Sequence, residues 1–256
     1  MKSRNTYELS LMRKSGAIAA SALKKALQAI KVGVSELEVD KLAEEEIYRL
    51  GGDLSYKSVP GYNYATCVTV NEQVVHGIPT ARKFVAGDIV SVDLAVVYKG
   101  WHTDCAWSVL VDAGNWKLEA REEKEKFLEI GEEALQEGIA QAVAGNRVGD
   151  ISAAIQSKVE GAGYSIVKSL VGHGVGRSLH EDPEIPGYGK KGAGHLLKRG
   201  MTLAIEVIYA KGGSEVVLEK DGWTFSTEDH SYAGLFEMSV VVEKGKGEVL
   251  TDWRIP

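Results

Sequence analysis

Cysteine, basic charge and long apolar runs are all scarce in this sequence. Two cysteines, Cys67 and Cys105, stand among 256 residues, which is too few for a disulfide framework and favours a reducing compartment. The 30 Lys and Arg residues are outnumbered by 36 Asp and Glu residues, so no overall basic field attracts nucleic acid. No apolar run reaches the length that spans a bilayer. We therefore expect a cytoplasmic protein that does not enter a membrane.

What is present is ordinary globular composition, 44% hydrophobic and 26% charged, in helix-like and strand-like patterns. Apolar residues recur at helical spacing from Tyr7 to Ile30. Ser35 and Glu38 then fit a capping box, which predicts a second helix that ends near the glycines at 51 and 52. A similar pattern of a long helix followed by a second, glycine-terminated helix recurs 112 residues later, and its long helix is expected over 119–143. The repeat predicts two similar halves, about 1–112 and 113–256, which share one sheet and meet near Val111–Trp116.

The stretch Ile89–Val111 reads as two strands with a turn at Lys99-Gly100. If these two residues form the loop, residue 98 pairs with residue 101. Asp93 and Asp104 then lie on the same face as diagonal neighbours, because side chains alternate with period two. Two adjacent carboxylates repel one another, so they need a shared proton, a cation or a solvated face. The sequence of the hairpin alone does not distinguish these three possibilities.

Other ionisable residues stand where a strand should be apolar or a turn is tight. Strands are expected over 66–70, 165–171, 201–209 and 235–242, and the last two each carry a single acid, Glu206 and Glu237. His173 and His180 lie in a glycine-rich run that does not follow the order of a phosphate-binding loop, and His76 precedes a glycine.

These residues form a consistent set only if they meet. The four carboxylates and the neutral imidazole of His173 sum to −4, and two divalent cations would return that charge to zero. An oxygen-rich ligand set suits cobalt, manganese, iron or zinc. Two metals held in this way activate water and polarise a carbonyl, which is the chemistry of a hydrolase.

The ordered motifs resemble one known family. They are NEQVVHGIP (71–79), the D-x10-D hairpin, GHGVGRSLHEDP (172–183) and the strands that contain Glu206 and Glu237. Together they resemble the "pita-bread" metallopeptidases, specifically type I methionine aminopeptidases. The resemblance implies an α+β fold with two pseudo-symmetric halves, whose helices pack on a curved, mainly antiparallel sheet, and a single catalytic domain over 1–256.

The resemblance also implies roles for particular residues. Asp93 would bind one divalent metal ion, Asp104 and Glu237 would bridge two, and His173 and Glu206 would complete the second site. His76 and His180 would contact the scissile peptide, and Glu206 would carry a proton. A further set would line a pocket for the methionine side chain: Tyr62, Cys67, Leu179 and Trp223. The expected substrate is the N-terminal peptide of a nascent protein, and the expected enzyme is a monomer that contacts the ribosome transiently.

Several positions depart from the family's usual pattern. Val207 stands where proline is usual, Met238 where histidine is usual, Leu179 where an aromatic is common and Leu235 where glutamine is common. We expect these changes to weaken the support of the metal ligands. Two alternatives remain. One is an aminopeptidase or dipeptidase directed at Xaa-Pro bonds, and the other is a catalytically silent binding module, which would be expected to lose ligands that this chain keeps.

Overall fold

A computed structural model describes residues 3–112, 114 and 118–254 of the chain. Within them the four α-helices are α1 (Thr6–Ala29), α2 (Glu36–Arg49), α3 (Leu118–Ala140) and α4 (Val148–Gly161). The first two helices begin at capping boxes, in which Asn5 accepts a hydrogen bond from the amide of Glu8 and Ser35 from that of Glu38. The predicted start of the second helix is therefore confirmed.

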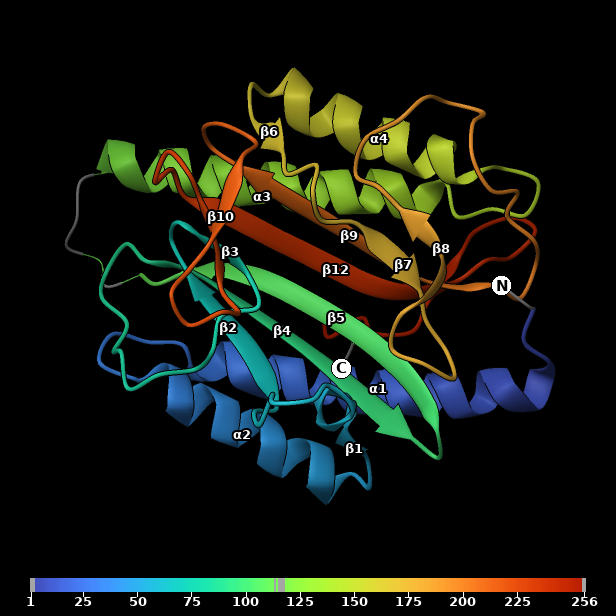
Figure 1. Cartoon of the computed structure of the whole chain (residues 1–256), viewed down its shortest axis with the longest axis horizontal. Helices are drawn as coiled ribbons and strands as arrows, with labels where there is room; N and C mark the ends of the chain where they lie inside the picture. The colour runs from blue at the N-terminus through green and yellow to red at the C-terminus, as the bar shows by residue number, and fades with distance from the viewer. Residues whose placement is uncertain (1–2, 113, 115–117, 255–256) are drawn as a thin grey trace.

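A large antiparallel sheet forms the centre of the molecule (Figure 1). Its main strand order in the described residues is β1-β4-β5-β12-β9-β7-β8. In addition, β2 pairs with β4, β6 with β9 and β13 with β12. The bounds are β1 Asp53–Leu54, β2 Thr66–Val70, β4 Ile89–Tyr98, β5 Trp101–Leu110, β6 Ser165–Ile166, β7 Gly172–Gly174, β8 Glu181–Ile185, β9 Thr202–Ala210, β12 Ala233–Val241 and β13 Glu248–Val249. A smaller sheet contains β3 (Gln73–Val75), β10 (Val216–Leu218) and β11 (Phe225–Thr227).

The α+β fold class is confirmed, and the two predicted halves contain corresponding elements. α2 and α4 each span 14 residues, and each is followed by a short strand that pairs with a long one, β1 with β4 and β6 with β9. The helices α1 and α2 pack on the first half, α3 and α4 on the second (Figure 1). The halves join where β5 pairs with β12, so one sheet runs through both. Of the predicted boundary, residues 113, 115 and 116 lie outside the described residues.

One predicted strand is much shorter than expected. Of the stretch 165–171 only Ser165–Ile166 pairs as a strand, and the next strand begins at Gly172. The amide of Val167 still donates to the carbonyl of Ile208 at 3.0 Å. Beyond it, Leu170 packs with Val167 into a separate apolar cluster beneath the small sheet, and this burial replaces further pairing.

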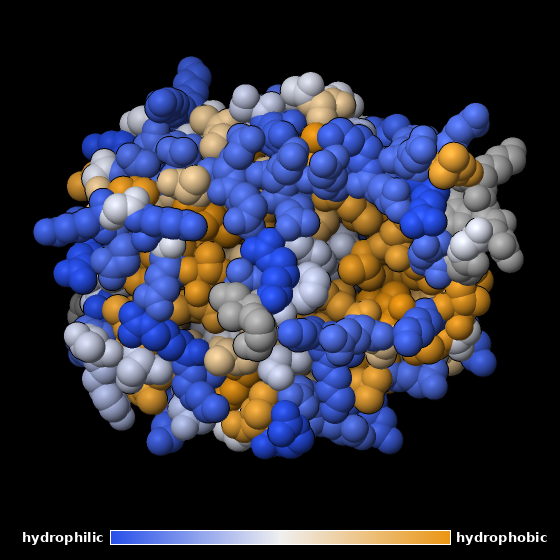
Figure 2. Space-filling model, turned by 180° about the vertical axis from the view of Figure 1, so that it is seen from behind, coloured by the Kyte–Doolittle hydropathy of each residue, from blue (hydrophilic) through white to orange (hydrophobic). Residues whose placement is uncertain are grey.

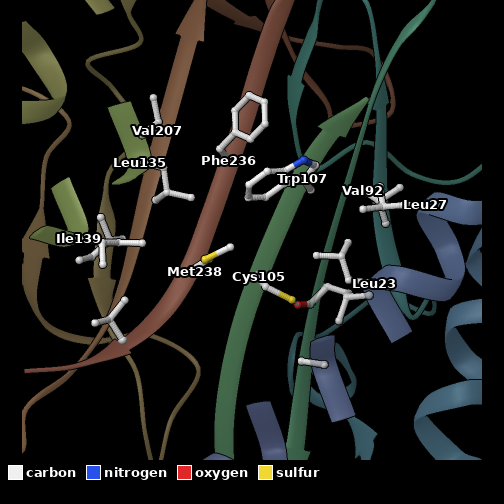
Figure 3. Packing of buried hydrophobic residues seen from close by; sticks show 14 of the residues in the cluster. Leu23, Leu27, Val92, Cys105, Trp107, Leu135, Ile139, Val207, Phe236 and Met238 are labelled. Carbon is white, nitrogen blue, oxygen red and sulfur yellow. Dashed lines mark hydrogen bonds between the residues drawn. The ribbon is translucent and has the colours of Figure 1, made fainter. Parts of the chain in front are cut away.

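The hairpin of β4 and β5 has the predicted register. Lys99 and Gly100 adopt φ angles of 50° and 75°, as a type I′ turn requires, and Tyr98 pairs with Trp101. One face of the hairpin packs against α1, and the same face of β9 and β12 packs against α3. Figure 3 shows this core between the sheet and the helices: Leu23, Leu27, Val92, Cys105, Trp107, Leu135, Ile139, Val207, Phe236 and Met238. The opposite face of these strands is therefore left for other side chains.

The outside of the molecule is mixed in character. Figure 2 shows the face behind that of Figure 1, where apolar side chains reach the surface between bands of polar ones. None of the helices in the described part of the chain is long and apolar enough to cross a membrane.

We predict that Gly131→Ala destabilises the fold. A Cβ atom at this position of α3 would overlap the hydroxyl of Tyr209 and the ring of Phe236, so the helix would have to move off the sheet. We expect a loss of about 1–3 kcal/mol in the free energy of unfolding, measured by urea denaturation. The matched control is Gly161→Ala at the end of α4, where no atom lies within 4 Å of the added carbon. Equal stability of the two variants would contradict this packing.

Candidate metal centre and adjoining pocket

The helix-free face of the sheet carries three of the four acids in one row across five strands. Each residue of the row pairs with the next in register, so all their side chains point to the same side: Cys67, Asp93, Ala106, Glu237 and Glu206. The register of β12 against β9 places the two glutamates directly opposite one another. The strands β4, β12 and β9 thus bring three carboxylates to one line.

A second row, two residues along the same strands, supplies the remaining ligand candidates. Asp104 pairs with Ala95, and His173 pairs with Ala204, whose other partner is Ser239. The neighbours of the ionisable residues in both rows are small, which leaves space in front of the sheet. The hydroxyl of Ser239 accepts from the amide of Asp104 and donates to its carbonyl, both at 2.9 Å, and so holds β5 to β12 at this point.

All eleven site residues expected from the sequence line one cavity of about 170 Å³, which is many times the space that one water molecule needs. They are Asp93, Asp104, His173, Glu206, Glu237, His76, His180, Tyr62, Cys67, Leu179 and Trp223. Sequence reasoning missed three lining residues, Tyr56, Val59 and Val75. Tyr56 comes from the short 3₁₀ helix η1 (Ser55–Ser58), and its hydroxyl donates to Oδ1 of Asp93 at 2.7 Å. No spacing in the sequence connects these two residues.

The pair of aspartates does not lie on a solvated face. Asp104 and Glu237 are 5% and 4% exposed, while Asp93 and Glu206 are half-buried and line the cavity. Oδ1 of Asp104 and Oε1 of Glu237 are buried and find no hydrogen-bond partner among the described residues. Buried polar atoms are almost always paired, so these two oxygens indicate a missing positive partner.

The donor set fits a divalent cation. Asp104, His173 and Glu237 each offer one ligand atom, and these atoms lie within 4.8 Å of one another. Nε2 of His173 is 3.9 Å from Oδ2 of Asp104, while its Nδ1 is 2.9 Å from the carbonyl of Gly174. A hydrogen bond of Nδ1–H to that carbonyl leaves Nε2 free to bind a metal.

Burial sets the charge of this site. It raises the pKa of Asp93 to about 6 and that of Glu206 to about 8. Burial also raises the pKa values of Asp104 and Glu237 well above their usual range, and the neighbouring carboxylates raise them further. The same burial lowers the pKa of His173 to about 4, so its imidazole is neutral near pH 7, as a metal ligand must be. Without a cation the site therefore retains protons.

Glu181, the first residue of β8, makes hydrogen bonds and an ion pair that stabilise the loop carrying His180. The carboxylate of Glu181 accepts from the amides of Arg177 and Ser178 at 2.6 and 3.2 Å, and it pairs with the guanidinium of Arg4. The His180 ring centroid lies 4.4 Å from that of His173. The beginning of the chain thus supports this loop, a connection that no sequence pattern indicated.

Apolar and aromatic side chains close the cavity next to the carboxylates. Tyr62, Cys67 and Leu179 belong to one buried cluster, on which Trp223 packs. The Tyr62 and Trp223 rings meet edge to face, with centroids 5.2 Å apart. The ring of His76 contacts that of Phe225 in a similar way, at 5.9 Å. The residues expected to form a side-chain pocket therefore lie together.

The departures from the family pattern fall in different places. Val207 and Met238 point to the helix side of the sheet and are buried in the core (Figure 3), so neither contacts the carboxylates. Leu235 belongs to the apolar cluster beneath the small sheet, and Leu179 lines the cavity. An influence of Val207 or Met238 on the ligands would have to pass through the backbone of the strand.

An antiparallel sheet of this topology, with carboxylates and an imidazole around a cavity, defines the pita-bread class of metal-dependent hydrolases. Residues 10–243 match the model of metallopeptidase family M24, and the chain belongs to this family. It is 40% identical over 248 residues to the methionine aminopeptidase of Clostridium perfringens, covering 97% of each chain. The crystal structure of methionine aminopeptidase from Thermotoga maritima superposes with a TM-score of 0.93 at 39% identity, covering 98% of this chain and 99% of that one.

A more distant likeness shows the fold alone. The prolidase of Pyrococcus furiosus superposes with a TM-score of 0.75 at 21% identity, over 97% of this chain but 65% of that one.

We predict that the metal-free protein loses stability as the pH rises from about 6.5 to about 8. The folded state holds protons on Glu206, Asp104 and Glu237 that the unfolded chain has released, so unfolding releases protons and becomes easier at higher pH. Buried histidines have the opposite effect on stability, because their pKa values are lowered in the folded state. This effect is confined to pH values below about 6.5, where the histidines of the unfolded chain become protonated. Thermal unfolding at several pH values measures this slope.

Glu206→Gln is the matched variant for this experiment, because it removes one of the titrating groups at almost constant volume. We expect a shallower loss of stability between about pH 6.5 and about pH 8 than in the unaltered chain. Stability that is constant or rising across this interval would contradict the assigned protonation of the buried acids.

Proposed function

We propose that the chain is a methionine aminopeptidase, which removes the initiator methionine from nascent proteins by hydrolysis assisted by two divalent metal ions. The observation that carries the proposal is the meeting of Asp104, His173 and Glu237 beside a substrate-sized cavity, with two carboxylate oxygens left unpaired. Similarity to methionine aminopeptidases over nearly the whole chain supports the same conclusion.

We assign the metal ligands as follows. Asp93 would be a ligand of one ion, His173 and Glu206 would be ligands of the other, and Asp104 and Glu237 would serve both. Cobalt, manganese, iron and zinc all suit this donor set. Bound ions of this kind would polarise the substrate carbonyl and lower the pKa of the attacking water.

The remaining polar residues would act on the peptide directly. Glu206 would take the proton of the attacking water and deliver it to the leaving amine, since its carboxyl lines the cavity beside the other ligand candidates. Burial lowers the pKa values of His76 and His180, so both imidazoles are neutral and can each donate one hydrogen bond. We assign His180 to the developing oxyanion and His76 to the orientation of the peptide.

The methionine side chain would occupy the apolar end of the cavity, against Tyr62, Cys67, Leu179 and Trp223. A thioether packs favourably on aromatic rings, which suits this lining. We further propose that residues 1–256 form one catalytic domain, that the enzyme is a cytoplasmic monomer, and that it meets its substrate in transient contact with the ribosome.

We predict that Asp104→Asn and Glu237→Gln abolish methionine release and lower the content of bound metal. Each change removes one negative charge from the ligand set at almost constant volume. Metal analysis after reconstitution and hydrolysis of Met-Ala-Ser measure the two effects. The control is Glu129→Gln, which removes an acid of an exposed ion pair with Lys126 on α3 and should change neither. Full activity of metal-analysed Asp104→Asn would contradict the proposal.

The peptide specificity is tested separately. We predict that the reconstituted enzyme hydrolyses Met-Ala and Met-Gly peptides and leaves Xaa-Pro peptides intact. A preference for Xaa-Pro would favour the alternative specificity. Absence of both metal binding and turnover would favour a silent binding module.

A further inference from the structure

The two tyrosines that line the cavity, Tyr56 and Tyr62, direct their hydroxyls to different partners. The Tyr56 side chain is 8% exposed, and its hydroxyl donates to Oδ1 of Asp93 at 2.7 Å. The neighbouring Tyr62 also lines the cavity, but its hydroxyl donates to the backbone carbonyl of Thr66, likewise at 2.7 Å. One buried phenol therefore contacts a candidate metal ligand, and the other contacts the main chain.

The position of Tyr56 is fixed by the strands that carry the acids. Ser55, which precedes it in η1, lies 2.7 Å from Nδ1 of His102 on β5 through its hydroxyl. Leu54 pairs with Val96 on β4, the strand of Asp93. The two residues that precede Tyr56 are thus attached to both strands of the hairpin, which places the Tyr56 hydroxyl beside the carboxylate that it contacts.

A hydrogen bond of this kind has a defined effect on a ligand. The terminal torsion of an aspartate is broad, and an isolated carboxylate can rotate through many orientations. A single donor on Oδ1 selects one orientation and does so without adding charge, so the balance between four acids and two divalent cations is unchanged. Partners of this type that orient metal ligands commonly contribute 10- to 100-fold to metal affinity, as an order of magnitude.

The ring of Tyr56 faces the apolar end of the same cavity. It meets the ring of Tyr62 edge to face, with centroids 5.6 Å apart and planes at 85°. Tyr62 in turn packs on Trp223, and the cluster also contains Cys67 and Leu179. The same side chain therefore contacts both the candidate metal ligand and the wall assigned to methionine.

We propose that Tyr56 is a positioning residue whose hydroxyl orients the Asp93 carboxylate for metal binding, while its ring forms a wall of the methionine pocket. This inference rests on the proposed function and adds a residue that connects recognition of the substrate side chain with the metal ligands.

The test compares two variants that each lose one phenol hydroxyl from the same cavity. The full chain is stripped of metal with a chelator and titrated with Mn²⁺ by calorimetry. We expect Tyr56→Phe to weaken Mn²⁺ binding by about 10- to 100-fold. Tyr62→Phe should bind Mn²⁺ within about twofold of the unaltered chain, because its hydroxyl contacts the backbone and no carboxylate. Thermal unfolding of the metal-free forms verifies that both variants are folded.

Steady-state kinetics distinguish the effect of losing the Tyr56 hydroxyl from the effect of losing its ring. At saturating Mn²⁺ we expect Tyr56→Phe to recover most of its turnover of Met-Ala-Ser with an unchanged KM, because the ring remains. Tyr56→Leu, which also removes the ring, should in addition raise the KM.

Two results would overturn the inference while leaving the proposed function intact. One is Mn²⁺ binding by Tyr56→Phe that equals that of the unaltered chain, and the other is an equal loss in Tyr62→Phe. If the unaltered chain bound no Mn²⁺ and released no methionine, the proposed function would fail, and this inference with it.

Discussion

Repulsion among buried carboxylates is the constraint on which this structure depends. Asp104 and Glu237 lie almost wholly inside the protein, with Asp93 and Glu206 beside them at the cavity wall. Charged groups in such a position are unfavourable unless they take up protons or acquire cations. The raised pKa values express the first solution and the unpaired oxygens leave room for the second. The fold must therefore hold these four carboxylates together and leave room for cations beside them.

The two faces of the sheet have different roles: one packs against the helices and the other carries the buried acids. On the helix side, residues such as Trp107, Phe236 and Met238 form a continuous apolar core that holds the strands in register. On the other side the neighbours of the acids are small, as at Ala95, Ala106 and Ala204, so space remains in front of the carboxylates. Because side chains alternate along a strand, a shift of one residue in register would exchange these faces. The packing of the core thus fixes the geometry of the site.

Local periodicity predicted a large part of this organisation. The spacing of Asp93 and Asp104 across a two-residue turn was sufficient to place them on one face, and Ser35 with Glu38 was sufficient to start α2. The approach of Glu206 to Glu237 depends on pairing between β9 and β12, which periodicity does not specify; only their isolated positions in apolar strands indicated a shared site. Resemblance to a family, rather than spacing, suggested their roles.

Contacts made through irregular segments could not be predicted in this way. Tyr56 reaches Asp93 from a short 3₁₀ helix, and Arg4 reaches Glu181 from the start of the chain. The run after Ile166 has strand-like composition, but burial in a side cluster competes with pairing and ends the strand early. Sequence periodicity describes regular elements well, whereas these features depend on which surfaces the completed fold brings together.

The most direct measurement of the central claim is anomalous diffraction at the manganese edge from crystals of the full chain grown with Mn²⁺. We predict two anomalous peaks, both within coordination distance of the carboxylates of Asp104 and Glu237, with His173 beside one of them. Anomalous density only at the molecular surface, with none beside the four acids, would contradict it.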